Sequence, residues 1–201
     1  MSTTTKPVIL PWRIVIDTAE QSPWPFDGIR ADAAKDGRPI VVETVRRCLG
    51  RYPISYGDYS LESADGRQSF VGWCNVERKS LEDCQSTILG FGDGHRERFE
   101  QELENLSRLI TGDGGCAMVV VECSVEQLLR SAPSHGKKTA SQNAKTLLRS
   151  ILAYQQDYRV PWLFAGSRRL AEIATFRFLE RFWRHHHTNN NKKGLCHVHR
   201  T

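Results

Sequence analysis

Apolar residues in this chain of 201 residues gather in short runs, and turn-forming residues separate the runs. Three runs have the length of strands: WRIVIDT at 12–18, CAMVVVEC at 116–123 and VPWLFAG at 160–166. Apolar runs of this length are typical of strands that are covered on both faces of a sheet. We therefore predict that these three segments lie in a buried sheet.

Two further strands are predicted to form a hairpin. YPISYGDYSLES at 52–63 precedes the turn signal ADGR at 64–67, and SFVGWCNVERK at 69–79 follows it. Asp-Gly between two strand-like runs is a strong hairpin signal. Within the first of these strands, Gly57 precedes Asp58 and permits a bend or a bulge at that point.

Segments with helical spacing of apolar residues lie between the strands. Ser80 is expected to cap a helix, because Asp83 supplies an acid three residues later, as in a capping box. We predict helices at 40–50, from Ser80 onward, at 96–110, at 141–156 and at 167–184.

The order of these elements predicts the fold class. Strands separated by helices need crossover connections, whereas a hairpin adds an antiparallel pair. We therefore predict an α/β fold with a central mixed β-sheet flanked by helices on both faces. We expect a flexible N-terminus at 1–11, one domain at 12–184 that contains a basic loop insertion at 131–145, and a polar, disordered tail at 185–201.

Composition narrows the class of protein. The net charge is +5, and 20 of the 28 basic residues are arginine, which favours an anionic partner. No secretory signal or run of eighteen apolar residues is found, so we expect an intracellular protein, in the cytoplasm or nucleoid of a bacterium or in a eukaryotic nucleus. The six cysteines form no CxxC pair, so we predict buried free thiols rather than a zinc site.

The charged end of the second hairpin strand is the main candidate for chemistry. Residues two apart on a strand share a face, so Glu77 and Lys79 point to one side, whereas the direction of Arg78 stays open. The hairpin brings Asp58 toward Glu77. Two carboxylates with a main-chain oxygen and water suit Mg²⁺ or Mn²⁺, and a nearby lysine can orient a water or balance charge on a phosphoryl oxygen. The alternative is a solvated strand end with a surface ion pair.

These residues carry a resemblance to a known family. GDYSL at 57–61, followed by VERKSLED at 76–83, resembles the signature G-D-[YV]…[VI]-E-R-K-x-x-x-D of the XPF-family (ERCC-type) nuclease domain. IVIDTAEQ at 14–21 and RFEQEL at 98–103 are similar to that family's first strand and to the helix after its active site. The resemblance covers 12–184 and implies a restriction-endonuclease-like, PD-(D/E)XK nuclease core.

The resemblance implies a role for each matching residue. Asp58 and Glu77 would be the main metal ligands, and Lys79 would position the attacking water. Arg78 would contact the substrate or the catalytic cluster. Asp83 would support the site by holding Arg78 or a bound water.

The first strand would supply the acidic edge of the cleft. Asp17 would join the metal ligands, and Glu20 would lie beside it. The chain departs from the family at Ala19, where an arginine is common, and Arg96 or Arg98 are candidates to replace that arginine.

The function that the resemblance implies is a Mg²⁺- or Mn²⁺-dependent DNA endonuclease. It would hydrolyse phosphodiester bonds at flaps, forks or other branched DNA, leaving a 5′-phosphate and a 3′-hydroxyl, in DNA repair or recombination. A standalone domain of this kind fits a phage or prophage-type gene. The alternatives are a non-catalytic DNA-binding or scaffold partner of a nuclease, and a nuclease for unbranched DNA. The complete acid–Arg–Lys run favours activity.

The family's tandem helix-hairpin-helix module has no counterpart in this sequence. We therefore expect DNA contacts from a separate DNA-targeting partner or from basic residues of the chain. The candidates are Arg96, Arg98, Lys137, Lys138 and Lys145.

The end of the chain suggests a partner and an alternative site. The predicted helix at 167–184 carries more aromatic residues than one apolar stripe needs, so we expect a homodimer through the last strand and helix. The tail holds possible zinc ligands, but their irregular spacing favours disorder instead. These ligands are His185–His187, Cys196, His197 and His199.

Overall fold

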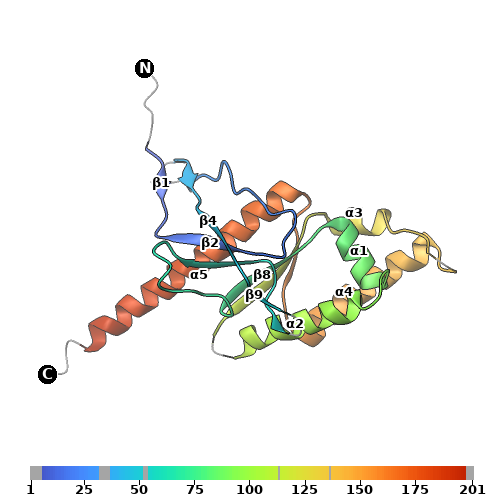
Figure 1. Ribbon diagram of the computed structural model, residues 1–201. Coiled ribbons are helices and arrows are strands. Elements are labelled where there is room, and N and C mark those ends of the chain that lie inside the picture. Colours follow the sequence, from blue (N-terminus) through green and yellow to red (C-terminus); the bar gives the residue numbers. More distant parts are fainter. Residues whose placement is uncertain (1–5, 32–36, 52–53, 113, 136, 198–201) are drawn as a thin grey trace, which may run out of the picture.

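The computed structural model describes residues 6–31, 37–51, 54–112, 114–135 and 137–197. A six-stranded mixed sheet forms its centre (Figure 1). In spatial order its strands are β10 (Trp162–Phe164), β9 (Cys116–Val121), β8 (Cys74–Lys79), β7 (Tyr59–Ser63), β2 (Trp12–Asp17) and β4 (Thr44–Arg47). Two short pairs lie beside it: β1 (Val8–Ile9) with β3 (Ile40–Val41), and β5 (Gly50–Arg51) with β6 (Ile54–Ser55).

Both parallel and antiparallel pairs occur in the sheet. β10, β9 and β8 are parallel to one another, as are β2 and β4, whereas β7 is antiparallel to both β8 and β2. The predicted hairpin is therefore present as β7 and β8, and it joins the two parallel parts of the sheet.

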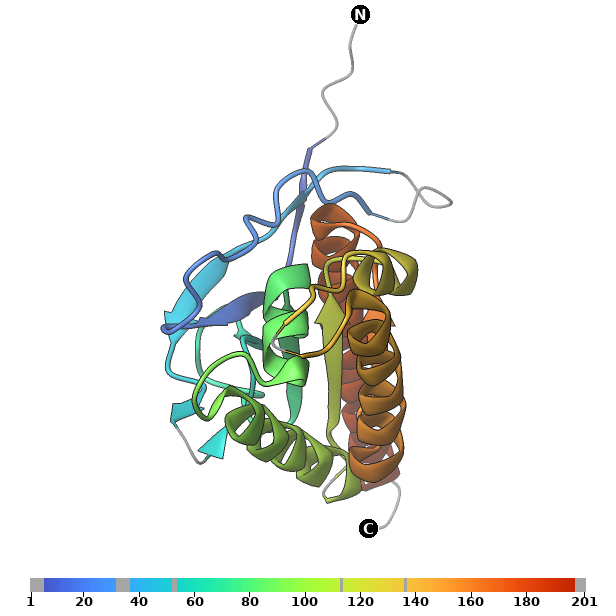
Figure 2. The same ribbon diagram turned by 90° about the vertical axis from the view of Figure 1, so that its right-hand side faces the viewer.

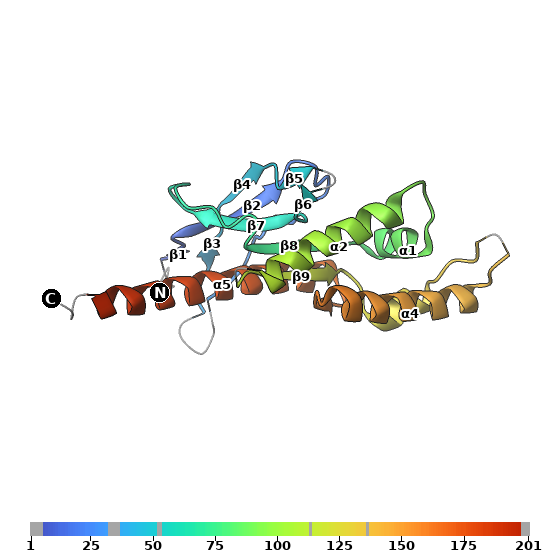
Figure 3. The same ribbon diagram turned by 90° about the horizontal axis from the view of Figure 1, so that it is seen from below.

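Helices cover both faces of the sheet, as predicted. They are α1 (Leu81–Leu89), α2 (His95–Thr111), α3 (Val125–Arg130), α4 (Ala140–Tyr158) and α5 (Arg168–His197). α1, α2 and α4 pack against one another (Figure 2), and α5 packs on β8 and β9 from the opposite face. In Figure 3 the C-terminal part of α5 extends past one end of the sheet, and the start of α4 extends past the other.

The strand period divides the core between the two faces. On β9, Met118 and Val120 join the apolar cluster under α5, while Ala117, Val119 and Val121 join the cluster under α1, α2 and α4. Because β9 is buried on both sides, its sequence is apolar throughout. The same alternation on β8 decides which side each charged residue of the candidate site faces.

Side-chain caps fix where several helices begin. The hydroxyl of Ser80 accepts from the Asp83 N–H, as the sequence predicted. Full capping boxes at Ser124 and Thr139 start α3 and α4. α3 lies in a segment where no helix is predicted from the sequence.

The predicted helix at 40–50 is wrong, because this segment contains β3, β4 and the first residue of β5. β4 is an edge strand that pairs in parallel with β2, and most of its side chains are exposed. The few apolar residues of the segment 40–50 resemble a weak helical stripe. The conformation of β4, however, depends on pairing with a strand about thirty residues away in the chain. A pattern within one segment does not contain that information.

The C-terminal helix extends further than predicted. The boundary at 184 is wrong for the described residues, since α5 continues through His185–His187 to His197. The His186 ring lies 4.8 Å from the Phe70 ring, and the His187 ring lies 3.9 Å from the Trp183 ring, so aromatic contacts support the first turn beyond Arg184. Residues 198–201, which include His199, lie outside the described part.

Much of the aromatic excess on α5 is used within the chain. Trp12 stacks on Phe176 and Trp183, and Phe70 packs edge-on against Phe182. The homodimer therefore stays a prediction. In the described part of the chain, no helix is both long and apolar enough to cross a membrane.

Candidate active site

Gly57 positions the first candidate ligand. Its φ of +83° is rarely adopted by other residues, and a Cβ there would lie 2.9 Å from the Val76 carbonyl oxygen. The backbone thus passes close to β8, and the Asp58 N–H donates to that same carbonyl at 2.9 Å. The predicted bend beside Asp58 is present, and only glycine fits it without strain.

The alternation of side chains along β8 then decides which side of the sheet each charged residue faces. Glu77 and Lys79 are register partners of Val119 and Val121, and they face α1 and α2. The Lys79 ammonium lies 4.6 Å from the Phe99 ring centroid and forms an ion pair with Glu77. Arg78 faces the opposite side, where it lies near Trp24. Its direction, open from the sequence, is thereby assigned.

These residues border one cavity of about 530 Å³ at the ends of β7 and β8. The loop after β2 and the start of α1 complete its wall. The lining residues are Ala19, Glu20, Gln21, Ser22, Asp58, Glu77, Arg78, Lys79, Ser80 and Asp83. Six of the charged residues selected from the sequence therefore converge on a single cavity.

The α2 side of the cavity is crowded with carboxylates. Burial raises the pKa of Asp58 well above its ordinary value, and the charges of Glu77 and Glu102 raise it further. Burial and Glu77 likewise raise the pKa of Glu102, to about 8. Burial opposes the charge of Lys79, but Glu77, Glu102 and Asp58 raise its pKa, so it stays an ammonium. The cluster carries more potential negative charge than one lysine balances.

The donor set fits a hard divalent cation. Asp58 Oδ2 accepts a hydrogen bond from the main-chain N–H of Arg78 at 2.8 Å, which fixes the carboxylate against β8. Glu77, only 3% exposed, lies on the same side of the sheet. Among the described residues, no three His, Cys, Asp or Glu side chains form a metal site by themselves. Mg²⁺ commonly binds one or two carboxylates and keeps several waters, which matches this arrangement.

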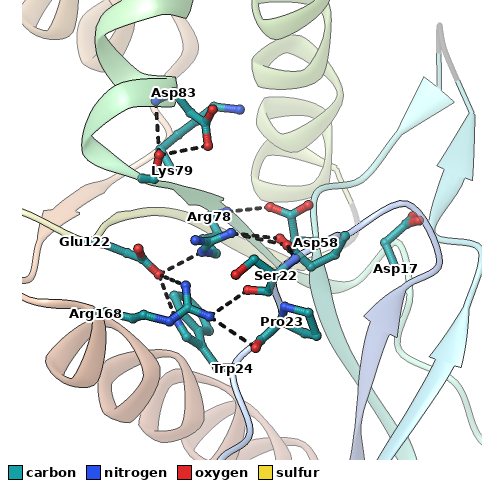
Figure 4. A network of polar contacts seen from close by, with 12 residues as sticks. Asp17, Ser22, Pro23, Trp24, Asp58, Arg78, Lys79, Asp83, Glu122 and Arg168 are labelled. Carbon is teal, nitrogen blue, oxygen red and sulfur yellow. Dashed lines mark hydrogen bonds and ion pairs between the residues drawn. The ribbon is translucent and has the colours of Figure 1, made fainter.

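On the other face, Arg78 belongs to a buried polar network (Figure 4). Its Nε donates to Glu122 at 2.8 Å, and its Nη1 donates to Glu20 at 3.2 Å. Glu122 also accepts from Trp24 Nε1 and from Arg168. Burial opposes ionisation of Glu122, but the hydrogen bonds from Arg78 and Trp24 keep its pKa below the ordinary value. This network connects the strand end to the loop after β2.

Two predicted contacts are corrected. Asp83 lines the cavity but accepts from the Ser80 hydroxyl at 2.9 Å, and it does not hold Arg78, which faces the other side. Asp17 does not line the cavity. Its carboxylate accepts from the amides of Ala19 and Leu49 and lies apart from the Asp58 carboxylate (Figure 4), although the Asp17 main-chain N–H donates to the Asp58 carbonyl at 2.8 Å. Asp17 is thus no longer included among the proposed metal ligands.

The predicted DNA-binding residues lie outside the cavity wall. Arg96 and Arg98 occupy the first turn of α2, where Arg96 pairs with Glu100 at 2.9 Å. Neither lines the cavity that Ala19 borders. Lys137, Lys138 and Lys145 are exposed on the loop before α4 and on α4 itself. Their contact with DNA stays a prediction.

Three residues of the site were missed from the sequence. Glu102 reaches the carboxylate cluster from α2, where Ser55 donates to it at 3.0 Å. Glu122 follows β9, and Arg168 begins α5. Glu122 directly follows a continuous apolar strand, and this abrupt change to an acid was the available signal. Glu102 gave no such signal, because acids are common on helix surfaces.

The prediction of free thiols fits the five described cysteines, but the prediction that they are buried is wrong for Cys48. Cys74, Cys84 and Cys123 are buried, Cys116 is partly buried, and Cys48 is exposed, all without disulfides. The side chain of Cys196 lies outside the described part.

Comparison with known proteins gives a match in structure but not in sequence. No protein-family model matches the chain. No curated protein matches it either. Two solved structures are similar: XPF from Aeropyrum pernix, with a TM-score of 0.53 and 17% identity, and the same protein in complex with DNA, with a TM-score of 0.52 and 15% identity. Each match covers 86% of this chain, which spans only 65% of the length of the matched chain. At such low identity the similarity shows the fold alone: this chain has a fold similar to that of the matched part of XPF.

Proposed function

We propose that this protein is a metal-dependent DNA endonuclease whose active centre is the cavity bordered by Asp58, Glu77 and Lys79. The observation that carries this proposal is the convergence of two carboxylates and a lysine where β7 begins and β8 ends. A structure with the same fold was solved in complex with DNA, which makes DNA the favoured substrate.

The residues divide the chemistry among them. Asp58 and Glu77 would hold Mg²⁺ or Mn²⁺, and this ion, when bound, would offset the negative charge that develops on the phosphoryl group. Lys79 lies beside Glu77 and, once Glu77 binds a cation, would be free to orient a water toward phosphorus. The products would be a 5′-phosphate and a 3′-hydroxyl.

Arg78 has an indirect role in this proposal. Its guanidinium is held by Glu20 and Glu122, so it connects the loop after β2 to the strand that carries the catalytic residues. Arg78 would therefore position the wall of the cavity rather than bind the scissile phosphate. Asp83 and Glu20 would shape the rim.

Substrate and assembly extend the proposal. Branched DNA, such as flaps and forks, is the preferred candidate, with unbranched DNA and a non-catalytic scaffold role as alternatives. A homodimer would form around the edge strand β10 and the start of α5, where Leu163 and Leu170 are 38% and 54% exposed. A separate DNA-targeting partner would supply further affinity.

The test is cleavage of labelled flap, fork, four-way junction and linear duplex DNA with Mg²⁺, with Mn²⁺ and with EDTA. We expect cleavage that requires the metal, and loss of cleavage in Asp58→Asn and Lys79→Ala. Arg108→Ala, which removes an exposed arginine from α2, is the matched control and should cut normally. The absence of metal-dependent cleavage on every substrate would reject the enzyme and favour the scaffold role.

A further inference from the structure

A second cavity, of about 600 Å³, lies between α5 and the segment 28–31. Its floor is apolar and includes Ile29 and Ile173. Its rim is formed by five arginines, which we term the α5 arginine face. These are Arg30, Arg169, Arg177, Arg181 and Arg184.

The spacing of these residues makes a continuous row. Arg169, Ile173, Arg177 and Arg181 follow one another at intervals of four residues, so they share one side of the helix. Arg184 lies three residues beyond Arg181 on the same side. At the rise of an α-helix, the distance from Arg169 to Arg184 is roughly 22 Å.

Two glutamates hold the arginines in place without neutralising the row. Glu180, buried on α5, accepts from Arg177 at 2.8 Å and from Arg184 at 2.7 Å, and Glu172 accepts from Arg169 at 2.6 Å. Five arginines thus oppose two carboxylates. A guanidinium has five N–H donors, so each paired arginine keeps donors for a further anion.

The row begins close to the candidate active site. One loop supplies Glu20, Gln21 and Ser22 to the active-site cavity and, a few residues later, the segment 28–31 to the arginine face. Arg168, which precedes Arg169, donates to Glu122 and to the Ser22 carbonyl. A polyanion that enters the active-site cavity would therefore meet the α5 arginine face beside it.

We propose that the α5 arginine face binds the phosphodiester backbone of DNA that flanks the cleavage position. The row of roughly 22 Å covers about six base-pair steps along the axis of a duplex. The partner is thus a long polyanion rather than a single phosphate. This inference rests on the proposed function for its substrate, but it concerns affinity and not the chemical step.

The test measures binding of a fluorescently labelled linear duplex by anisotropy, in EDTA, across a range of salt concentrations. Arg181→Ala/Arg184→Ala should weaken binding about tenfold or more and reduce the slope of log affinity against log salt by about two. Arg181→Lys/Arg184→Lys keeps the charges and should retain most of the affinity. Arg108→Ala, which also removes an exposed arginine paired with a glutamate four residues earlier, should leave both values unchanged.

The possible outcomes test the DNA-binding role of the α5 arginine face separately from the proposed nuclease function. If the double alanine variant binds with the affinity and salt slope of the wild type, the inference is overturned, whether or not the protein cleaves DNA. If it keeps DNA affinity but loses self-association in sedimentation, the face binds a second copy instead, which also overturns the inference. Binding that depends on the arginines, without any metal-dependent cleavage, would support the inference and reject the proposed function.

Discussion

Gly57 offers the sharpest test of how the site is built. In Gly57→Ala, the new Cβ would lie 2.9 Å from the Val76 carbonyl oxygen and 3.2 Å from Glu77 Cα, both of which are backbone atoms of β8. A positive φ costs a residue with a side chain about 1–2 kcal/mol. Overpacking against backbone adds about 1–3 kcal/mol. We therefore expect the free energy of unfolding to fall by about 2–5 kcal/mol.

Gly72→Ala is the matched control. Gly72 has a φ of +82°, almost the same as Gly57, but a Cβ there meets no atom within 4 Å. Gly72→Ala should therefore lower the free energy of unfolding only by the cost of the positive φ, about 1–2 kcal/mol. Both values are measured by urea denaturation, and cleavage is measured on the same preparations.

The two substitutions should also differ in activity. Gly57→Ala moves Asp58 relative to Glu77, and a displacement of that kind costs about 100-fold in rate. Gly72→Ala should cut DNA at the wild-type rate. Equal losses of stability and equal rates in the two variants would refute the close approach of Gly57 to β8 as the device that positions Asp58.

Three further predictions concern the two sides of β8 and the start of α4. Arg78→Ala leaves Glu20 and Glu122 with fewer partners in a buried network, so urea denaturation should show a loss of about 1–3 kcal/mol, and a loss near zero would contradict the network. Glu102 has a folded-state pKa of about 8 against an ordinary 4.5. The free energy of unfolding of the wild type therefore falls as the pH rises from 4.5 to about 8. In EDTA, Glu102→Gln should thus raise the melting temperature at pH 8 by about 2–4 °C, with little change at pH 5, and the reverse pattern would contradict the raised pKa. Thr139→Ala removes the cap of α4 and should cost about 1 kcal/mol in the same denaturation assay, whereas no change would indicate a frayed start of the helix.

The sequence predicted the central part of the fold because its signals are local. The Asp-Gly turn, the apolar run of β9 and the capping serine before α1 each depend on neighbouring residues only. The segment 40–50 was mispredicted because β4 is defined by pairing with β2. The continuation of α5 beyond 184 was missed for a similar reason, since it is supported by contacts with Phe70, in the connection between β7 and β8.

The site was predictable to the extent that it lies on one hairpin. The strand period gave the shared direction of Glu77 and Lys79, and Gly57 marked the bend beside Asp58. Arg78 was undetermined until its partners Glu20 and Glu122 were known. Glu122 and Glu102 come from elements that reach the hairpin only in the folded chain, so spacing in the sequence does not connect them to it.

The most direct measurement of the central claim is the single-turnover rate of DNA cleavage with Mg²⁺ in wild type, Glu77→Gln and Arg108→Ala purified in parallel. Glu77→Gln keeps the shape of the side chain and removes one carboxylate from the cavity. We predict a loss of about 10²–10³-fold in Glu77→Gln and an unchanged rate in Arg108→Ala. A Glu77→Gln variant that cuts as fast as the wild type would contradict the assignment of this cavity as the active centre.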